Sequence, residues 1–430
     1  MSAAEDAAAA KRCSPFLAAL SAEKKNEALA EIRAALLAGA GDIAAANRRD
    51  VLSAREAGLA APLVKRLQFD EAKLIDACAG ITSLAGLDDP VGRVLSAREL
   101  DEGLKLYQVS CPIGVVGVIF ESRPDALIQI SCLCLKSGNA VILKGGREAA
   151  QTNRVLFDAL LRAGRRAGLP DGWAALLETR EDVAELLSLG SFIDLIIPRG
   201  SNEFVRHIMK NTSIPVMGHA DGICHIYIDE GADFASAEKI VVDSKTQYPA
   251  VCNAVETLLV HERAAREFLP GLAASLQARG VTLKGCGRTQ KIISCEGASE
   301  EDWRTEYLDL ILSVKIVSSL EEAASHINFY GSGHTDCIVS SSSENAGRFM
   351  AGVDSANVFW NASTRFADGY RYGLGAEVGI STARIHARGP VGLEGLVIYK
   401  WRLYGEGHCV APYAEGQREF THRVLPKELP

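Results

Sequence analysis

The sequence predicts an α/β protein built around parallel, doubly wound sheets. After about residue 112, short apolar segments alternate with segments of helical character, which is typical of a parallel sheet. The apolar run GVVGVIF at 114–120 is continuous, as in a strand covered on both faces. With 430 residues, of which 48% are hydrophobic, the chain is long enough to fill two or three domain cores.

The first ninety residues predict helices. The stretch 23–54 is rich in Ala, Leu, Glu and Lys, and its apolar residues recur at helical spacing. At 97–114 the pattern changes, because apolar and polar residues begin to alternate. This alternation predicts a half-exposed strand or hairpin.

A first series of strands and helices follows. After the strand at 114–120 we expect a helix that begins at Pro124 and ends before Gly138, since proline favours the first turn and glycine the end of a helix. The strand 140–144 and the helix 148–168 come next. The remaining expected elements of this series are 173–178, 181–190, 192–198 and 201–211.

A second series is expected after a loop at 243–253, which places a boundary near residue 246. Its expected strands and helices are 256–261, 262–279, 310–317, 321–331, 336–340, 343–352 and 356–360. The tail 396–416 returns to strand-like alternation, and we expect it to pair with the segment near residue 100 as a small extra sheet. Such edges are often covered by another subunit.

Composition excludes several classes of protein. A formal charge of −8 argues against nucleic-acid binding, and no apolar run reaches the roughly 18 residues that span a bilayer. The N-terminus lacks the basic start and apolar core of a signal peptide. The 11 cysteines are scattered without a CxxC, and the 9 histidines form no HxxxH pair. We therefore expect no metal site, free thiols and a reducing cytoplasm.

Two turns between a strand and a helix are candidate anion sites. PRGS at 198–201 precedes a helix start, where backbone N–H groups favour phosphate, although an ordinary turn explains these residues more readily. Lys144 and Arg147 flank a pair of glycines, and they suit a phosphate monoester such as the 2′-phosphate of NADP. A solvated basic turn explains this second segment equally well.

Three further features carry candidate chemistry. His219 lies in a turn between two apolar runs and suits a proton carrier or anion contact, although a lone histidine is more often structural. The segment 361–395 is irregular and rich in glycine and arginine, which suits an anionic substrate. Cys252 precedes an apolar run, as either a buried inert thiol or a nucleophile displayed by a loop.

Five segments together carry a family resemblance. The segments 121–146, 196–205, 218–225, 247–261 and 372–396 resemble the γ-glutamyl phosphate reductases, a branch of the aldehyde dehydrogenase superfamily, and the resemblance runs in order along nearly the whole chain. It implies an aldehyde-dehydrogenase-like fold with three parts. These are an NADP-binding domain at 1–95 and 112–245, a catalytic domain at 246–388, and a strand-pair oligomerisation element at 96–111 and 389–430.

The same resemblance implies a reaction. NADPH would reduce L-glutamyl 5-phosphate to L-glutamate 5-semialdehyde and phosphate through a cysteine thioester, on the route to proline. It also implies a cytoplasmic homo-oligomer, either dimer or tetramer, with glutamate 5-kinase as a possible partner. A related dehydrogenase acting on acyl-CoA is one alternative, and a cofactor-binding scaffold without catalysis is another.

Residue by residue, Cys252 matches the nucleophile of the family. The resemblance assigns cofactor contacts to Lys144, Arg147, Gly200, Ser201 and Glu377. Arg147 stands where many NAD-using relatives carry a ribose-binding glutamate, and a guanidinium there attracts the 2′-phosphate of NADP.

Departures from the superfamily pattern add further candidates. His219 stands where oxidising relatives carry a general-base glutamate, which suits a reductive enzyme that must not hydrolyse its thioester. Ser122, beside Arg123, stands where those relatives carry an oxyanion-hole asparagine. Arg123, His219 or an arginine of 382–389 is expected to hold the leaving phosphate. The expected substrate contacts are Ser363, Thr364 and Arg365.

Overall fold

The computed structural model describes residues 2–178 and 181–429, which form two compact units. Unit 1 comprises Met1–Val216, Gly375–Val378 and Val391–Pro430, and unit 2 comprises Met217–Leu374 and Gly379–Pro390. Each unit contains its own parallel sheet, so the predicted α/β class is confirmed. The assignment of NADP-binding, catalytic and oligomerisation domains stays a prediction.

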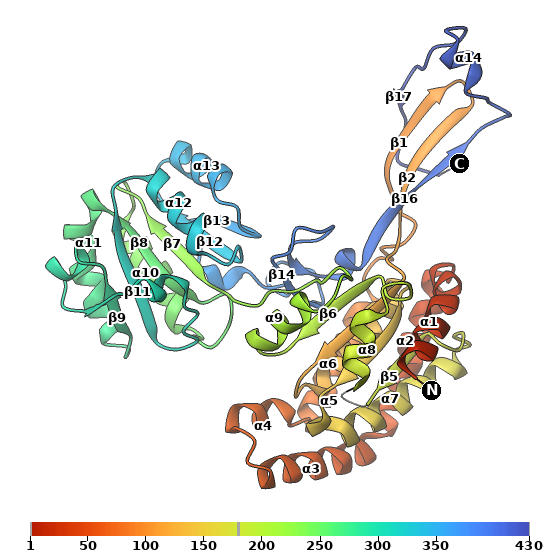
Figure 1. Cartoon of the computed structure of the whole chain (residues 1–430), viewed down its shortest axis with the longest axis horizontal. Helices are drawn as coiled ribbons and strands as arrows, with labels where there is room; N and C mark the ends of the chain where they lie inside the picture. The colour runs from red at the N-terminus through yellow and green to blue at the C-terminus, as the bar shows by residue number, and fades with distance from the viewer. Residues whose placement is uncertain (1, 179–180, 430) are drawn as a thin grey trace. The chain divides into compact units, whose positions relative to one another are not determined.

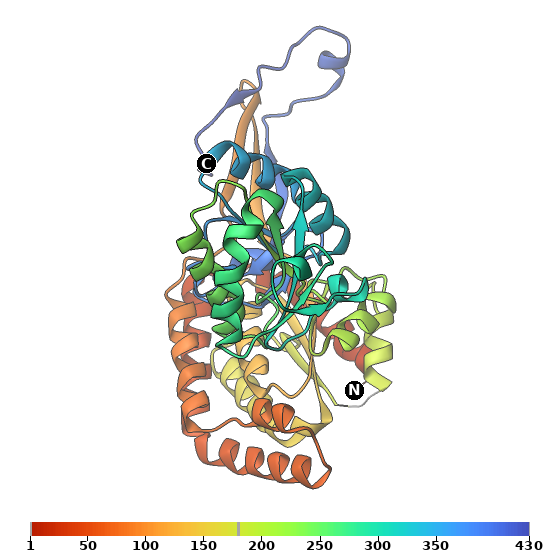
Figure 2. The same ribbon diagram turned by 90° about the vertical axis from the view of Figure 1, so that its left-hand side faces the viewer.

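The N-terminal part of unit 1 is helical, as predicted. Ser2, Ser21 and Asp70 each cap a helix by accepting a hydrogen bond from a backbone N–H in its first turn. Figures 1 and 2 show these helices in red and orange beside the other helices of unit 1. They are α1 (Ala3–Ala18), α2 (Ala22–Ala38), α3 (Ala40–Glu56), α4 (Ala61–Leu67) and α5 (Glu71–Ala85).

The parallel sheet of unit 1 has the strand order β5-β4-β3-β6. Its strands are β3 (Val115–Phe120), β4 (Ala140–Gly145), β5 (Ala174–Leu177) and β6 (Leu195–Arg199). The intervening helices are α6 (Pro124–Lys136), η1 (Arg147–Ala149), α7 (Ala150–Arg166), α8 (Glu181–Ser188) and α9 (Asn202–Lys210). Every residue of β3 and β4 is buried, which confirms the expectation of strands covered on both faces.

A separate antiparallel sheet in unit 1, here called the arm sheet, has the order β16-β2-β1-β17. Its strands are β1 (Val94–Asp101), β2 (Leu104–Pro112), β16 (Val397–Tyr404) and β17 (Arg423–Val424), and η5 (Leu393–Leu396) and α14 (Ala411–Ala414) flank β16 in the chain. The predicted pairing of the tail with the segment near residue 100 is confirmed, since β16 pairs with β2 from Val397–Pro112 to Tyr404–Lys105. The arm sheet projects from the helices of unit 1 in Figures 1 and 2.

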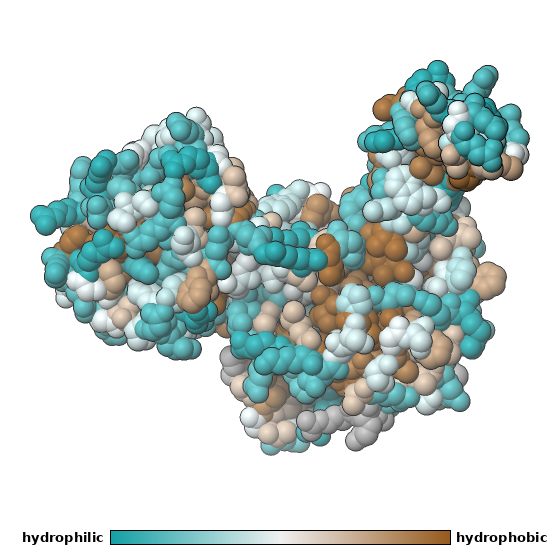
Figure 3. Space-filling model, turned by 45° about the horizontal axis from the view of Figure 1, so that its top comes forward, coloured by the Kyte–Doolittle hydropathy of each residue, from teal (hydrophilic) through white to brown (hydrophobic). Residues whose placement is uncertain are grey.

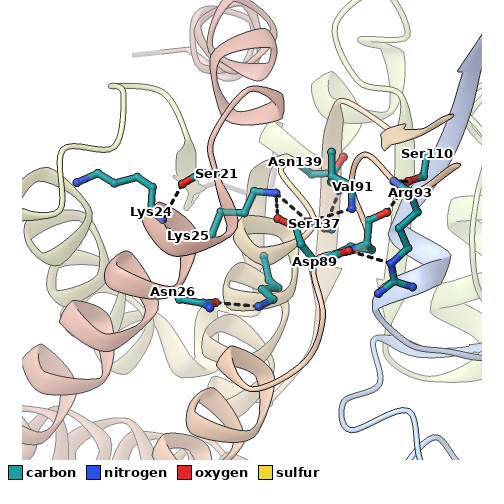
Figure 4. A network of polar contacts seen from close by, with 12 residues as sticks. Ser21, Lys24, Lys25, Asn26, Asp89, Val91, Arg93, Ser110, Ser137 and Asn139 are labelled. Carbon is teal, nitrogen blue, oxygen red and sulfur yellow. Dashed lines mark hydrogen bonds and ion pairs between the residues drawn. The ribbon is translucent and has the colours of Figure 1, made fainter. Parts of the chain in front are cut away.

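A buried polar network ties the start of the arm sheet to the helices (Figure 4). Lys25 of α2 is fully buried, and its Nζ donates to both carboxylate oxygens of Asp89 at 2.8 and 3.1 Å. The Asp89 carboxylate also accepts from Val91 N, and its carbonyl accepts from Arg93 Nε. Arg93 N in turn donates to Ser110 Oγ of β2 at 2.9 Å. One carboxylate thus fixes the chain where it leaves the helices.

Replacing Asp89 with alanine is expected to lower the free energy of unfolding by about 3 kcal/mol, because Lys25 would keep a buried charge without its partner. Chemical denaturation followed by circular dichroism measures this loss. Glu27→Ala is the matched control, because Glu27 pairs with Lys24 at the exposed surface and should cost no more than about 0.5 kcal/mol. Equal losses in the two variants would contradict the structural role of Asp89.

Unit 2 is built on a seven-stranded parallel sheet with the order β10-β9-β11-β8-β7-β12-β13. Alternate residues of β7 point to opposite faces: Ile226 packs in the core formed with α10 and α11, and Tyr227 in the core formed with α12 and α13. The strands are β7 (Cys224–Ile228), β8 (Val255–His261), β9 (Thr282–Gly285), β10 (Glu296–Gly297), β11 (Ile311–Val317), β12 (Thr335–Val339) and β13 (Asn357–Trp360). The helices are α10 (Phe234–Thr246), α11 (Glu262–Gln277), η2 (Thr289–Lys291), η3 (Glu301–Arg304), α12 (Leu320–Tyr330) and α13 (Ser343–Gly352).

Two expectations for this unit are wrong. Helix α10 continues through Thr246 into the expected loop at 243–253, because buried polar contacts hold its last turn: Lys245 pairs with Glu256, and Ser244 Oγ lies 3.0 Å from Ser363 Oγ. The second sheet also begins earlier in the sequence than expected, since β7 is one of its interior strands, between β8 and β12. The strand was not predicted because the glycine-containing residues directly before β7 indicated a turn.

The segment 361–395 is largely irregular, as expected. It contains η4 (Thr364–Phe366) and the short strands β14 (Gly379–Ser381) and β15 (Gly389–Val391), which pair with each other. In the described parts of the chain, no helix combines the length and the apolar character that crossing a bilayer requires.

Candidate active site

Three side chains from distant parts of the sequence meet at one edge of the unit 2 sheet. His219 precedes β7, Cys252 precedes β8, and His334 precedes β12. These three strands are neighbours in the order β8-β7-β12, and all run parallel, so their amino ends lie side by side. The Cys252 sulfur and one ring nitrogen from each histidine lie within 4.8 Å of one another.

The backbone of Cys252 is held from two sides. Its carbonyl accepts a hydrogen bond from the thiol of Cys224, with a sulfur-to-oxygen distance of 3.1 Å. Gly222 packs directly against it, because a Cβ atom at that position would lie 2.1 Å from the Cys252 carbonyl oxygen and 2.4 Å from its Cα. Only glycine allows this approach of two backbones.

The two histidines differ in their surroundings. His219 is half-buried, and its Nδ1 lies 2.8 Å from the carbonyl oxygen of Ile380. A carbonyl only accepts, so Nδ1 carries the proton and Nε2 of the neutral ring is an acceptor. His334 is fully buried, and burial holds its pKa well below the usual range. The rings meet edge to face, with centroids 4.9 Å apart.

Arg365 brings a positive charge to the thiol. Its side chain is 8% exposed, and its Nε donates to Gln247 Oε1 at 3.0 Å. Burial and the neighbouring charge of Arg371 lower the pKa of Arg365, whereas the negative charge of an ionised Cys252 opposes that shift. An ionised Cys252 and the Arg365 guanidinium therefore attract each other.

A buried ion pair brackets the loop that carries Cys252. Lys245, in the last turn of α10, donates to Glu256 of β8 at 2.6 Å, and both side chains are fully buried. Burial raises the pKa of Glu256 and lowers that of Lys245, and each group counteracts the shift of the other. The pair joins the two ends of the loop and limits its movement.

The other two expected substrate contacts are buried beside Arg365. Ser363 Oγ lies 3.0 Å from Ser244 Oγ, and Thr364 N donates to the same hydroxyl at 3.1 Å. Ser363 is 6% exposed and Thr364 is fully buried. These bonds attach η4 to α10 and so help to set the position of Arg365. A role in substrate binding stays a prediction for both.

The expected cofactor residues of unit 1 lie at the carboxyl ends of β4 and β6, near the point where the strand order reverses between β3 and β6. A Cβ on Gly200 would lie 2.4 Å from Glu121 Oε2, so the Glu121 carboxylate packs directly against this turn. Ser201 caps α9, and its backbone N–H donates to the same carboxylate oxygen at 2.9 Å. An amide that binds one anionic oxygen suits a phosphate equally well.

The second turn of this edge carries the expected basic groups. Lys144 is buried, its Nζ donates to the carbonyl of Gly145 at 2.5 Å, and burial lowers its pKa. Arg147 is the exposed first residue of η1. A Cβ on Gly146 would lie 2.1 Å from Glu148 Oε1, so the Glu148 carboxylate lies directly beside this turn. The donors and the exposed guanidinium fit a phosphorylated nucleotide cofactor.

The remaining expected site residues also belong to unit 1. Ser122 has a φ of 45°, and both its backbone N–H and its hydroxyl donate to Glu148 Oε1, at 2.6 and 2.8 Å. Arg123 is the residue before α6. The backbone carbonyl of Glu377 accepts from Gln129 Nε2 at 3.0 Å. Their roles at the reacting centre stay predictions.

The sequence reasoning missed several residues of this site: Gly222, Cys224, Gln247 and His334, together with the Lys245–Glu256 pair. One signal was available for His334, because it shortly precedes the apolar residues 337–339 and therefore lies near a strand end. The others follow from contacts that only the folded chain reveals.

Comparison with known proteins agrees with this architecture. The model of the aldehyde dehydrogenase family matches residues 2–284. A γ-glutamyl phosphate reductase of Pelotomaculum thermopropionicum is 62% identical over 418 residues, which cover 97% of this chain and 96% of the relative. The chain belongs to the γ-glutamyl phosphate reductases, a branch of the aldehyde dehydrogenase family.

Two further comparisons support membership in this branch. The γ-glutamyl phosphate reductase of Acetivibrio thermocellus is 60% identical over 430 residues and matches 100% of both chains. The crystal structure of a γ-glutamyl phosphate reductase from Thermotoga maritima superimposes with a TM-score of 0.93 at 39% identity, covering 95% of this chain and 100% of that one. The predicted aldehyde-dehydrogenase-like fold is thereby confirmed.

Proposed function

We propose that this chain reduces L-glutamyl 5-phosphate to L-glutamate 5-semialdehyde with NADPH, through a thioester on Cys252, in proline biosynthesis. The observation that carries the proposal is the grouping of the Cys252 thiol with His219, His334 and the Arg365 charge in unit 2. The names of relatives that match nearly the whole chain supply the substrate.

The first step is acyl transfer to sulfur. An ordinary thiol has a pKa of about 8.5, so only a small fraction is ionised at neutral pH and the thiol needs a base to remove its proton. The thiolate attacks the carbonyl carbon of the acyl phosphate, a C–S bond forms, and the C–O bond to phosphate breaks. Phosphate leaves with the bonding electron pair. Ser122 and Arg123 are the proposed contacts of the oxyanion and the phosphate.

The second step returns the thiol. The nicotinamide cofactor supplies a hydride to the thioester carbon. The resulting thiohemiacetal collapses, its C–S bond breaks, the aldehyde forms, and Cys252 leaves as a thiolate that takes a proton back from His219. Nε2 of His219 accepts the proton of the thiol before attack, because Ile380 holds the ring with Nδ1 protonated. A histidine in place of a carboxylate base suits a thioester that must be protected from water.

Trapping of the thioester tests this proposal. We expect the protein, incubated with glutamyl phosphate and no reductant, to gain the mass of one glutamyl group on the peptide that contains Cys252. NADPH should then remove that mass and yield the semialdehyde. An acyl-CoA offered in place of glutamyl phosphate should leave the peptide unmodified. Acylation at another cysteine, or none at all during turnover, would refute the proposed intermediate.

Lys144, Arg147, Gly200 and Ser201 are the residues proposed to hold NADPH. Arg147→Glu should raise KM for NADPH by at least about tenfold, since it replaces a charge-assisted contact with the 2′-phosphate by repulsion. KM for NADH, which lacks that phosphate, should change far less. Initial-rate measurements with both cofactors give the two KM values. Equal increases in KM for NADPH and NADH would refute the assignment of Arg147 to the 2′-phosphate.

We further propose that the chain acts in the cytoplasm as a homo-oligomer, with glutamate 5-kinase as a possible partner. The arm sheet supports oligomerisation, because Tyr399, Trp401 and Leu403 of β16 are 53–58% exposed. Figure 3 shows hydrophobic residues among hydrophilic ones on the arm sheet and gathered at its foot. Trp401→Glu should lower the mass found by light scattering, whereas Lys400→Glu, one position earlier, should preserve it.

A further inference from the structure

The three residues around the thiol also form a set of metal ligands. We propose that Cys252, His219 and His334 bind one Zn²⁺ ion, or another soft divalent cation such as Cd²⁺, and that this ion reversibly blocks the nucleophile. Binding depends only on the geometry of unit 2. Its inhibitory effect rests on the proposed function of Cys252.

The spacing of the three groups is close to that of a zinc site. The sulfur and the two ring nitrogens lie within 4.8 Å of one another. Zinc bonds of about 2.3 Å to sulfur and 2.0–2.1 Å to nitrogen, in a tetrahedral arrangement, would set these atoms roughly 3.4–3.6 Å apart. The largest of these separations must therefore shrink by up to about 1.4 Å. Cys252 and His219 are only half-buried, so their side chains have room to make this adjustment.

His334 supplies an independent sign that a ligand belongs here. It is fully buried, and its Nε2 has no hydrogen-bond partner among the described residues. An unsatisfied buried polar atom destabilises the folded chain, and a metal bond would remove that cost. Its other nitrogen, Nδ1, lies 2.8 Å from Thr335 Oγ1. Asn357 Nδ2 donates to the same hydroxyl at 3.2 Å.

The outer contacts resemble those that orient metal-binding histidines. Such histidines usually donate one ring N–H to a protein oxygen and bind the metal through the other nitrogen. His219 has this arrangement, with Nδ1 on the Ile380 carbonyl and the lone pair on Nε2. His334 has it too when Nδ1 donates to Thr335. The fold thus presets both rings for coordination.

The ligand set selects the class of metal. One thiolate and two imidazoles suit Zn²⁺ and Cd²⁺, whereas Mg²⁺ and Ca²⁺ prefer oxygen ligands. Three protein ligands leave a fourth position for water. Binding replaces the thiol proton, so that Cys252–SH and Zn²⁺ give Cys252–S–Zn⁺ and H⁺. The sulfur lone pair is then shared with the metal and cannot attack the substrate.

Titration of the metal-free, full-length protein tests the site. Calorimetry with Zn²⁺ should show one strong equivalent, and Co²⁺ should give a thiolate charge-transfer absorption at the same stoichiometry. Activity should fall in parallel and return after chelation. Cys252→Ser, His219→Asn and His334→Asn should each weaken Zn²⁺ binding by at least about 100-fold, because loss of a ligand exceeds the 10–100-fold typical of outer-shell changes. Circular dichroism checks that each variant folds. If the His334→Asn variant unfolds, the His219→Asn variant still tests the site, because His219 is only half-buried.

Two cysteines outside the cluster provide the matched controls. Cys286 is half-buried in the same unit and Cys409 is exposed. The variants Cys286→Ala and Cys409→Ser should therefore still bind one equivalent of Zn²⁺. Full binding in the Cys252→Ser variant, or its loss in the Cys286→Ala variant, would overturn the proposal. The two proposals fail separately: an active reductase that binds no Zn²⁺ refutes this site, and a Zn²⁺-binding protein without reductase activity refutes the proposed reaction.

Discussion

The variant Cys252→Ala should lose at least about 10⁴-fold in kcat for the reduction of glutamyl phosphate, because the acyl group then has no sulfur to receive it. The remaining rate would come from binding and from the electrostatic contacts around the carbonyl. Coupled assays of NADPH oxidation measure the forward reaction, and the oxidation of the semialdehyde in the presence of phosphate measures the reverse. Both directions should lose activity together, since they share the thioester.

The control for this loss is Cys286→Ala, which removes another half-buried thiol of unit 2. It should retain turnover within about twofold, since single substitutions away from a site have small effects. Cofactor binding, measured by fluorescence titration, should survive in Cys252→Ala, because the proposed cofactor residues lie in unit 1. Near-normal turnover in the alanine variant would exclude covalent catalysis by Cys252.

The second large effect is expected for Gly222→Ala. The added Cβ would lie 2.1 Å from the carbonyl oxygen of Cys252 and 2.4 Å from its Cα, and both are backbone atoms that cannot rotate away. The cysteine loop must therefore shift. A displacement of about 1 Å at a reacting group costs on the order of 100-fold in rate, so kcat should fall by about that factor.

Gly231→Ala provides the matched comparison, because nothing lies within 4 Å of the Cβ it would add. It should leave kcat unchanged. The rate of Cys252 alkylation by iodoacetamide reports the position of the thiol independently of turnover, and it should change in Gly222→Ala alone. If Gly222→Ala retains normal kcat and normal alkylation, the close packing of Gly222 on Cys252 has no functional importance.

Much of the fold was predictable because its signals are local. Residues 114–120 are continuously apolar, and the strand Val115–Phe120 is buried throughout. Pro124 and Gly138 mark the start and end of α6, where proline suits the first turn and Gly138 has a φ of 73°. Alternation in the tail predicted β16 and its pairing with β2, although β16 is exposed along nearly its whole length and has no buried face.

Other features depend on contacts between distant residues. Strand β7 was missed because the residues before it read as a turn, whereas its place between β8 and β12 is decided by packing on both faces. The cluster of His219, Cys252 and His334 requires that strand order, which no spacing in the sequence reveals. The Lys245–Glu256 pair is likewise a tertiary feature, formed across the cysteine loop.

Arg365 illustrates what chemistry alone can and cannot predict. Its setting among glycines and polar residues indicated a contact for an anionic group. The structure adds that its charge acts on the Cys252 thiolate and that Gln247 orients it. One guanidinium can interact first with a thiolate and then with a substrate anion. Only the folded chain reveals the interaction with Cys252.

The meeting of three strand ends at the thiol has a consequence for refolding. A slip of one residue along any of β7, β8 or β12 would carry its side chain away by about 3.3 Å. Pairing between segments so far apart in sequence is slow to form, because long loops must close first. After dilution from denaturant, turnover should therefore return only when β7, β8 and β12 have paired in the correct register. This should happen well after the helices regain their circular dichroism signal.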